Sequence, residues 1–128
     1  MAEAAVLDSS ALLCLLNGEA GAEQVVAALP LAVMSAVNLA EVVAKLRERG
    51  LLLEEIRTAL AGLSLDVRSF AADQAYESGD LRPPTRALGL SLGDRACLAL
   101  AAELDAPVLT ADREWRKLKL GVEIRLVR

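Results

Sequence analysis

The sequence predicts an α/β fold, with three α/β/α layers around a central parallel sheet of about five strands. Short runs rich in Val, Leu and Ile alternate with longer helical runs, which is the pattern of βαβ units. A length of 128 residues is that of one domain, and such a domain buries roughly two-thirds of its unfolded surface. We therefore expect a single domain over residues 1–128.

Five short segments have the β-rich, apolar character of strands in such a sheet. They are residues 4–8, 31–35, 63–70, 107–110 and 121–127. The first of them, AAVLD, leads directly into a helix that Asp8 or Ser9 can cap and that Asn17 and Gly18 can end. Ser35 can likewise cap the helix that follows the second strand. Strand, cap and helix thus follow one another as a βαβ unit requires.

The helices are predicted from their caps and from apolar residues at i, i+3 and i+4 spacing. They cover residues 9–18, 21–29, 36–50, 52–63, 71–81, 91–105 and 112–118. Residues 82–90 contain a Pro-Pro pair, which cannot lie inside a regular element, so we expect a loop there.

The composition is apolar, with 55% hydrophobic residues and a mean hydropathy of +0.40. This exceeds the usual share of roughly 45–50%, which leaves apolar surface for a partner. No apolar run approaches the roughly 18 residues that a membrane span needs. The acidic start MAEAAVLD also lacks the basic region of a signal peptide. We expect a soluble, cytoplasmic protein that does not enter a membrane.

Histidine is absent from the chain, which excludes several kinds of site at once. Ser-His-Asp triads, Cys-His dyads and His-containing zinc sites all need an imidazole. The two cysteines, Cys14 and Cys97, lie in apolar helical segments, and we expect them to be reduced core residues. Any chemistry must use carboxylates, hydroxyls, Lys and Arg.

Three aspartates occupy equivalent positions in the predicted fold. Asp8 ends the first strand, Asp112 follows the strand 107–110, and Asp94 lies in the first turn of the helix 91–105. Ligands of an open α/β sheet bind at the carboxyl ends of its strands, where these segments meet. The alternative is that each carboxylate caps a helix. Because Ser9 or Ser10, Ser91 and Thr110 can supply those caps, we interpret the carboxylates as surplus to capping.

Glu41 is the fourth candidate acid. It forms a polar stripe with Asn38 and Lys45 at i, i+3, i+7 spacing on an otherwise apolar helix. The alternative is an ordinary solvated helix face. Several converging carboxylates would raise one another's pKa values unless a cation neutralised them. Oxygen ligands without His or a Cys cluster favour Mg²⁺ or Mn²⁺, and such ions suit the chemistry of phosphate esters.

The net charge of −4 does not exclude a nucleic acid as substrate. Without the four candidate ligands, the acidic and basic side chains balance at 14 each. Arg95 and Arg113 follow two of the candidate acids directly and could hold phosphates there. For Arg86 and Arg116, ordinary solvated surface is the better interpretation. Three aromatic residues are too few for a platform on which bases stack.

Four sequence blocks together resemble the signature segments of PIN-domain ribonucleases, and most closely the VapC-type toxins of toxin–antitoxin pairs. The blocks are VLDSSALLCLLNGE, MSAVNLAEVVAKL, GLSLGDRACLALA and PVLTADREW. They agree in order and spacing from about Val6 to Val127. Any single block would be weak, whereas the four together are specific.

This resemblance implies a parallel-sheet α/β/α fold and a metal-dependent endoribonuclease that uses Mg²⁺ or Mn²⁺. It also implies that Asp8, Glu41, Asp94 and Asp112 are the acidic residues of the metal site, with Thr110 as a hydroxyl near the metal. Ser9 is a further hydroxyl candidate, which we place with Arg95 and Arg113 among possible substrate contacts. The family further implies a homodimer, a small inhibitory antitoxin, and products with a 3′-hydroxyl and a 5′-phosphate.

The remaining rival is a PIN fold without catalytic activity, which would act as a binding module through its partner complex. Other carboxylate-based classes disagree with the residues that follow Asp8. A phosphotransferase with an Asp nucleophile would want D-x-D, and a metal-dependent adhesion module would want D-x-S-x-S, where this chain has Leu12. A response-regulator receiver would want paired acids at the first strand and a Lys near the last strand.

Overall fold

The structure is a computed structural model that describes residues 3–128. Its five strands form one sheet in the order β3-β2-β1-β4-β5, and every pairing is parallel. The strands are β1 (Ala5–Leu7), β2 (Ala32–Ser35), β3 (Asp66–Arg68), β4 (Val108–Thr110) and β5 (Ile124–Leu126). The predicted α/β class and parallel sheet are therefore confirmed.

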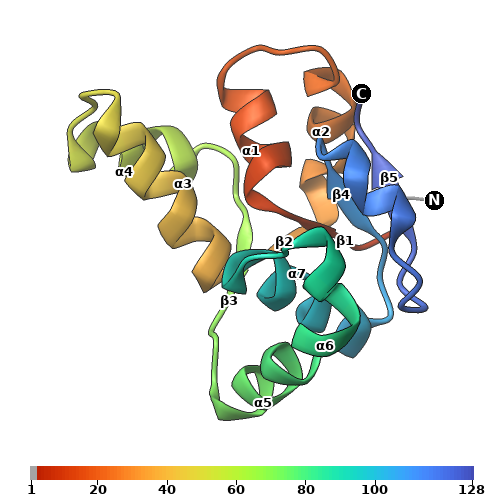
Figure 1. Ribbon diagram of the computed structural model, residues 1–128. Helices are drawn as coiled ribbons and strands as arrows, with labels where there is room; N and C mark the ends of the chain where they lie inside the picture. The colour runs from red at the N-terminus through yellow and green to blue at the C-terminus, as the bar shows by residue number, and fades with distance from the viewer. Residues whose placement is uncertain (1–2) are drawn as a thin grey trace.

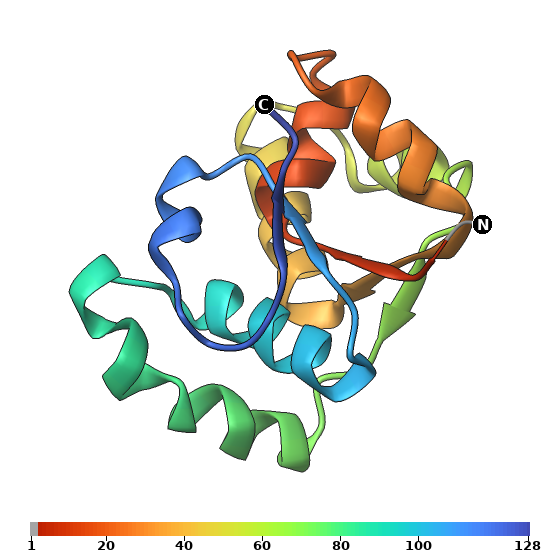
Figure 2. The ribbon, with the colours of Figure 1, turned by 90° about the vertical axis from the view of Figure 1, so that its right-hand side faces the viewer.

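Seven α-helices flank this sheet within residues 3–128. They are α1 (Ser9–Leu16), α2 (Ala22–Ala28), α3 (Ala36–Glu48), α4 (Leu53–Ala61), α5 (Ala72–Asp80), α6 (Arg82–Thr85) and α7 (Leu92–Leu104). Figure 1 shows α1 and α2 above the sheet and α5 and α6 below it. The turned view of Figure 2 shows the same layers, with the C-terminus on the side of α1 and α2.

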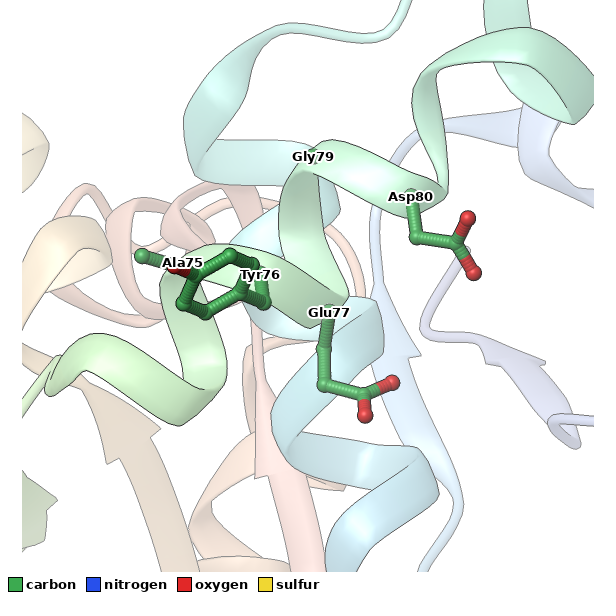
Figure 3. A pocket seen from close by; sticks show the side chains of 5 residues that line it. All are labelled: Ala75, Tyr76, Glu77, Gly79 and Asp80. Carbon is green, nitrogen blue, oxygen red and sulfur yellow. The ribbon is translucent and has the colours of Figure 1, made fainter.

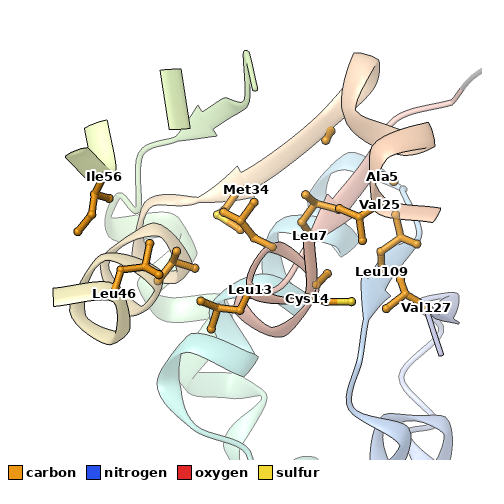
Figure 4. Close-up of a cluster of buried hydrophobic side chains, with 14 residues drawn as sticks. Ala5, Leu7, Leu13, Cys14, Val25, Met34, Leu46, Ile56, Leu109 and Val127 are labelled. Atoms are coloured by element: carbon orange, nitrogen blue, oxygen red, sulfur yellow. The ribbon is translucent and has the colours of Figure 1, made fainter. Parts of the chain in front are cut away.

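Successive residues of each central strand point to opposite faces of the sheet, which divides the core in two. Leu7, Met34 and Leu109, from three neighbouring strands, belong to a cluster with buried residues of α1 to α4. In Figure 4, α1 is seen end-on, with labelled side chains of this cluster beside it. Val6 and Val108 face the other way, into a cluster built largely by α7 and Trp115. Both faces are covered, as a parallel sheet requires.

The loop predicted over residues 82–90 is wrong. This segment contains α6 and a 3₁₀ turn over Arg86–Leu88. Pro83 and Pro84 lie in the first turn of α6, where a missing backbone N–H breaks no helical hydrogen bond. The predicted helix at 112–118 is a 3₁₀ helix over Arg113–Lys117. It is shorter than predicted at both ends, because Asp112 is its N-cap and Leu118 has an extended backbone.

Three other expectations can be compared with the structure. Cys14 and Cys97 are both free and buried, which confirms the expectation of reduced core residues. The predicted strand 63–70 shrinks to β3, whose residues are all exposed at the edge of the sheet. No helix within residues 3–128 is long and apolar enough to cross a membrane.

Candidate active site

A cleft of about 240 Å³ lies where the chain leaves the carboxyl ends of the central strands. Its lining comprises Asp8, Ser9, Ser10, Leu13, Glu41, Lys45, Asp94 and Asp112. The four acids come from four separate segments: the ends of β1 and β4, the body of α3 and the first turn of α7. Because β1 and β4 are neighbouring parallel strands, their ends meet at the same edge. We call this hollow the acidic cleft.

Asp8 lies at the floor of the acidic cleft and is only 3% exposed. Its Oδ1 accepts hydrogen bonds from the Ala11 backbone N–H at 2.8 Å and the Ser10 hydroxyl at 2.7 Å. Its Oδ2 accepts one from the Thr110 hydroxyl at 2.5 Å. Both carboxylate oxygens are therefore held by donors from α1 and β4.

Burial raises the pKa of Asp8 from 3.8 to about 6. The hydrogen bonds from Thr110, Ser10 and the Ala11 backbone lower it, and the negative charge of Asp94 raises it further. Desolvation disfavours the charged carboxylate more than these three hydrogen bonds stabilise it. A charged Asp8 is therefore costly to the fold, and a cation in the acidic cleft would offset that cost.

The negative charges of the acidic cleft also act on the thiol of Cys97, which is buried in α7. Burial is the main cause that raises the pKa of its thiol well above the usual value. The charges of Asp8, Asp94 and Glu41 raise it further. The negative charges of these three carboxylates therefore act together on one part of the core.

The Thr110 hydroxyl couples two of the acids. This fully buried side chain donates to Asp8 and accepts the backbone N–H of Asp112 at 3.0 Å. Ser10 has a parallel role, because it donates to Asp8 and accepts the backbone N–H of Ala111 at 2.9 Å. These hydroxyls orient Asp8 and fix the loop that carries Asp112.

The expectation that hydroxyls would cap the helices in place of the acids is wrong for two of the three aspartates. Asp8 itself caps α1, and Asp112 caps the 3₁₀ helix by accepting the Glu114 N–H at 3.0 Å. Ser91 does cap α7, in a capping box in which Asp94 Oδ2 accepts the Ser91 N–H at 2.9 Å. Capping uses one oxygen of Asp94 and one of Asp112. Within residues 3–128 their second oxygens accept no hydrogen bond.

Glu41 does not lie on a solvated helix face. Its Oε1 accepts hydrogen bonds from the Ser9 hydroxyl at 2.6 Å and from Asn38 Nδ2 at 3.2 Å. Asn38 is itself buried, at 1% exposure, because α3 packs against α7. Of the predicted polar stripe only Lys45 is exposed, and it lines the acidic cleft. No feature of the local pattern distinguishes packing against another helix from exposure to water.

The two arginines predicted to hold substrate do not line the acidic cleft. Arg95 turns toward α5, where its Nη1 donates to the Ser78 carbonyl at 3.0 Å. Arg113 is exposed, and its Nε donates to the Arg128 carbonyl at 3.3 Å. Each arginine follows an acid of the cleft in the sequence, but neither guanidinium group lies in the acidic cleft.

The chemical type of the possible ligand atoms in the cleft suits a hard divalent cation. The cleft offers carboxylate and hydroxyl oxygens and neither imidazole nor thiolate, which is the ligand preference of Mg²⁺ or Mn²⁺. As the side chains stand, no three His, Cys, Asp or Glu residues in the described part of the chain form a group that could hold a metal ion. The four acids thus share one cleft without forming a closed coordination sphere.

A second, larger hollow of about 740 Å³ contrasts with this cleft. It lies along α5 and is lined by Ala75, Tyr76, Glu77, Gly79 and Asp80. Figure 3 shows that all five residues come from one helix, with Tyr76, Glu77 and Asp80 projecting from its surface. We call it the α5 hollow. It has carboxylates but no groups converging from other segments, so we do not assign chemistry to it.

Several solved structures resemble this chain over nearly its whole length. A toxin–antitoxin complex from Klebsiella pneumoniae matches with 24% identity and a TM-score of 0.71, covering 94% of this chain and 100% of that one. DNA-bound VapBC from Salmonella typhimurium matches with 19% identity and a TM-score of 0.74, covering 98% of each chain. VapC20 of Mycobacterium tuberculosis, described as a toxin that cleaves the sarcin-ricin loop, matches with 18% identity, a TM-score of 0.71 and coverage of 94% and 99%.

These likenesses establish the fold. A search of curated proteins returns no match. The family comparison covers most of the chain, because the sequence model of the PIN domain matches residues 5–120. That span includes all four acids of the acidic cleft and both hydroxyls that hold Asp8. The chain therefore belongs to the PIN domain family.

Proposed function

We propose that this chain is a metal-dependent endoribonuclease that hydrolyses RNA phosphodiester bonds and acts as the toxin of a toxin–antitoxin pair. The observation that carries the proposal is the acidic cleft of a PIN domain, in which carboxylates from three other segments line the same cleft as the buried Asp8. The raised pKa of Asp8, about 6, supports a cation as the intended partner of this carboxylate. One solved structure of the same fold is described as a toxin that cleaves the sarcin-ricin loop.

Asp8, Asp94 and Asp112 are proposed to hold Mg²⁺ or Mn²⁺, and Glu41 to bind the metal or position its water. The free second oxygens of Asp94 and Asp112 support this division of roles. When bound, the metal would polarise the phosphoryl oxygen, lower the pKa of a water and stabilise the leaving oxygen. Thr110 would hold Asp8 in place throughout, because its hydroxyl donates to Oδ2.

Ser9, Arg95 and Arg113 remain proposed contacts to the RNA. Ser9 lines the cleft, and its hydroxyl lies 2.6 Å from Glu41, so it stands beside the reacting phosphate in this proposal. Arg113 is exposed next to Asp112 and suits a flanking phosphate. Arg95 has the weakest support of the three, since its guanidinium is engaged by Ser78. The products would carry a 3′-hydroxyl and a 5′-phosphate.

Replacing Asp8 by Asn tests the enzymatic proposal. Asn caps a helix as well as Asp does, so the fold should survive while the charge is lost. We expect Mg²⁺-dependent cleavage of total RNA by the wild-type protein and none by Asp8→Asn. Asp80→Asn, in the α5 hollow, is the matched control and should cleave like the wild type. Wild-type activity in Asp8→Asn would refute the assignment.

The toxin role adds a small antitoxin as partner, a homodimer and a cytoplasmic site of action. A solved structure of this fold is described as a toxin–antitoxin complex, which supports an antitoxin here. The chain also has an apolar groove of about 520 Å³ between α3, α4 and the edge strand β3, with exposed Leu53 and Val67 on its wall. An antitoxin segment that covered this groove would remove apolar surface from water.

The rival proposal is a PIN fold that acts only as a binding module within a partner complex. It is favoured by two solved structures of this fold that are described as VapBC and VapBC2 bound to DNA. Expression without a partner separates the two. Growth inhibition that Asp8→Asn abolishes supports the ribonuclease, whereas inhibition that survives Asp8→Asn supports the binding module.

A further inference from the structure

The carboxyl group of Glu41 is held by contacts with three helices. Its Oε1 accepts from Ser9 of α1 and from Asn38, one turn earlier in α3. The whole carboxyl group, both oxygens and Cδ, abuts Gly93 in the first turn of α7. Three helices thus meet at one carboxyl group.

Gly93 is a glycine for reasons of space. A Cβ built at this position would lie 2.3 Å from both carboxylate oxygens of Glu41 and 2.4 Å from its Cδ. The residue lies within α7 and has no positive φ, so its backbone does not require glycine. Glycine costs a helix about 1 kcal/mol relative to alanine. The missing side chain therefore makes room for the Glu41 carboxylate at a small cost in helix stability.

Asn38 connects the same two helices by hydrogen bonds. Its Nδ2 lies 3.1 Å from the Gly93 carbonyl oxygen and 3.2 Å from Glu41 Oε1. Its backbone carbonyl accepts the Ser9 hydroxyl at 3.2 Å. A buried amide with these contacts ties the rotamer of Glu41 to the backbone position of α7.

The next residue along α7 is Asp94, which lines the same cleft. Fixing Glu41 against Gly93 therefore fixes it relative to Asp94 as well. We propose that Gly93 and Asn38 are positioning residues, which set the separation of the Glu41 and Asp94 carboxylates for a divalent cation. The role rests on the proposed metal chemistry of the cleft, in which groups that orient the ligands tune metal affinity.

Gly93→Ala tests this role without threatening the fold. The atoms that a Cβ would strike are the far end of a flexible side chain, so Glu41 should rotate away while α7 persists. Alanine should even favour the helix. We expect the affinity for Mn²⁺, measured by titration calorimetry, to fall about 10- to 100-fold. Gly79→Ala in α5 is the matched control, because a Cβ there meets nothing within 4 Å, and it should bind Mn²⁺ like the wild type.

A double-mutant comparison separates positioning from a general structural effect. If Gly93 acts through Glu41, then Gly93→Ala should weaken Mn²⁺ binding in the wild-type background but have little further effect in Glu41→Gln. Asn38→Ala should follow the same rule and serves as a second variant. Losses that simply add, or unchanged Mn²⁺ affinity in folded Gly93→Ala, would overturn the proposal.

The outcomes also distinguish this inference from the ribonuclease proposal. A wild-type protein that binds Mn²⁺ but cuts no RNA would refute the ribonuclease and leave the Gly93 comparison decisive. A wild-type protein that cuts RNA, with Gly93→Ala binding Mn²⁺ equally well, would refute the positioning role alone. A wild-type protein that binds no Mn²⁺ would overturn both.

Discussion

The acidic cleft and the α5 hollow both carry carboxylates, yet their physical situations differ. Glu77 and Asp80 of the α5 hollow are exposed side chains of one helix, where water solvates each charge separately. The acids of the cleft come from four segments, and Asp8 among them is buried. Bringing like charges together from distant segments, and burying one of them, destabilises the fold. Folding alone therefore does not explain why these acids converge. Convergence, more than the number of acids or the size of the hollow, therefore marks the candidate site.

The largest expected difference between the two hollows is in catalysis. Asp112→Asn keeps the cap on the 3₁₀ helix, because the amide oxygen can still accept the Glu114 N–H. It removes the charge that a metal would need. We expect Mg²⁺-dependent RNA cleavage to fall at least about 100-fold, the upper end of the loss seen on removing groups that support metal ligands. The melting temperature should change little.

Glu77→Gln in the α5 hollow is the control for Asp112→Asn, and it should alter neither cleavage nor melting. If Asp112→Asn keeps wild-type cleavage, Asp112 serves only as a cap, and the contrast between the hollows rests on the other three acids.

The second difference is in the pH dependence of stability, measured without metal. The folded pKa of Asp8, about 6, exceeds its ordinary value of 3.8. Because the native state holds this proton more tightly, the free energy of unfolding should fall as pH rises from 3.8 to 6. The two pKa values differ by about 2 units, which is worth about 3 kcal/mol. The slope fades only about one pH unit below 3.8 and about one unit above 6.

Urea unfolding in EDTA at pH 4 and pH 7 measures this effect. Relative to the wild type, Asp8→Asn should gain about 2 kcal/mol in the free energy of unfolding from pH 4 to pH 7, because its amide does not ionise. The gain is smaller than about 3 kcal/mol because Asp8 of the unfolded wild type, with its ordinary pKa of 3.8, is already partly ionised at pH 4. Asp80→Asn should gain almost nothing. A pH-independent difference between Asp8→Asn and the wild type would show that burial does not penalise the Asp8 charge.

The third effect concerns the hydroxyl that couples two acids. Thr110→Val keeps the shape of the side chain but removes the donor to Asp8 Oδ2 and the acceptor for the Asp112 N–H. We expect cleavage to fall about 10- to 100-fold, as for other groups that orient metal ligands. Thr110→Ser keeps the hydroxyl and should retain most activity. Equal activity in Thr110→Val and the wild type would contradict a role for this hydroxyl in the site.

Much of the fold was predictable because short apolar strands alternate with capped helices, as βαβ units require. The meeting of Asp8 and Asp112 followed from that topology alone, since parallel strands bring their carboxyl ends to one edge. The burial of Asn38 was not predictable, because the surface that covers it belongs to α7, more than fifty residues further along the chain. The direction of Arg95 was equally hidden, because it depends on a carbonyl of α5.

The caps show a second limit of the sequence. Asp8 and Ser9 are both good capping residues, so the pattern could not say which one would cap α1. The structure gives the cap to Asp8 and turns Ser9 toward Glu41. One carboxylate therefore serves both the helix and the cleft, and the capping interpretation and the functional interpretation of Asp8 do not exclude each other.

The smallest expected effect concerns the cap of α7, where Ser91 provides the cap and Asp94 lines the cleft. Ser91→Ala removes the hydroxyl that accepts the Asp94 N–H at 3.2 Å but leaves the backbone N–H that Asp94 Oδ2 accepts. We expect a loss of about 1 kcal/mol in the free energy of unfolding, typical of a lost N-cap. Cleavage at saturating Mg²⁺ should stay within about twofold, because one bond of the capping box still orients the carboxylate. A large loss of cleavage with unchanged stability would reverse this assignment, and would place the Ser91 hydroxyl in the chemistry of the cleft and not in the cap of α7.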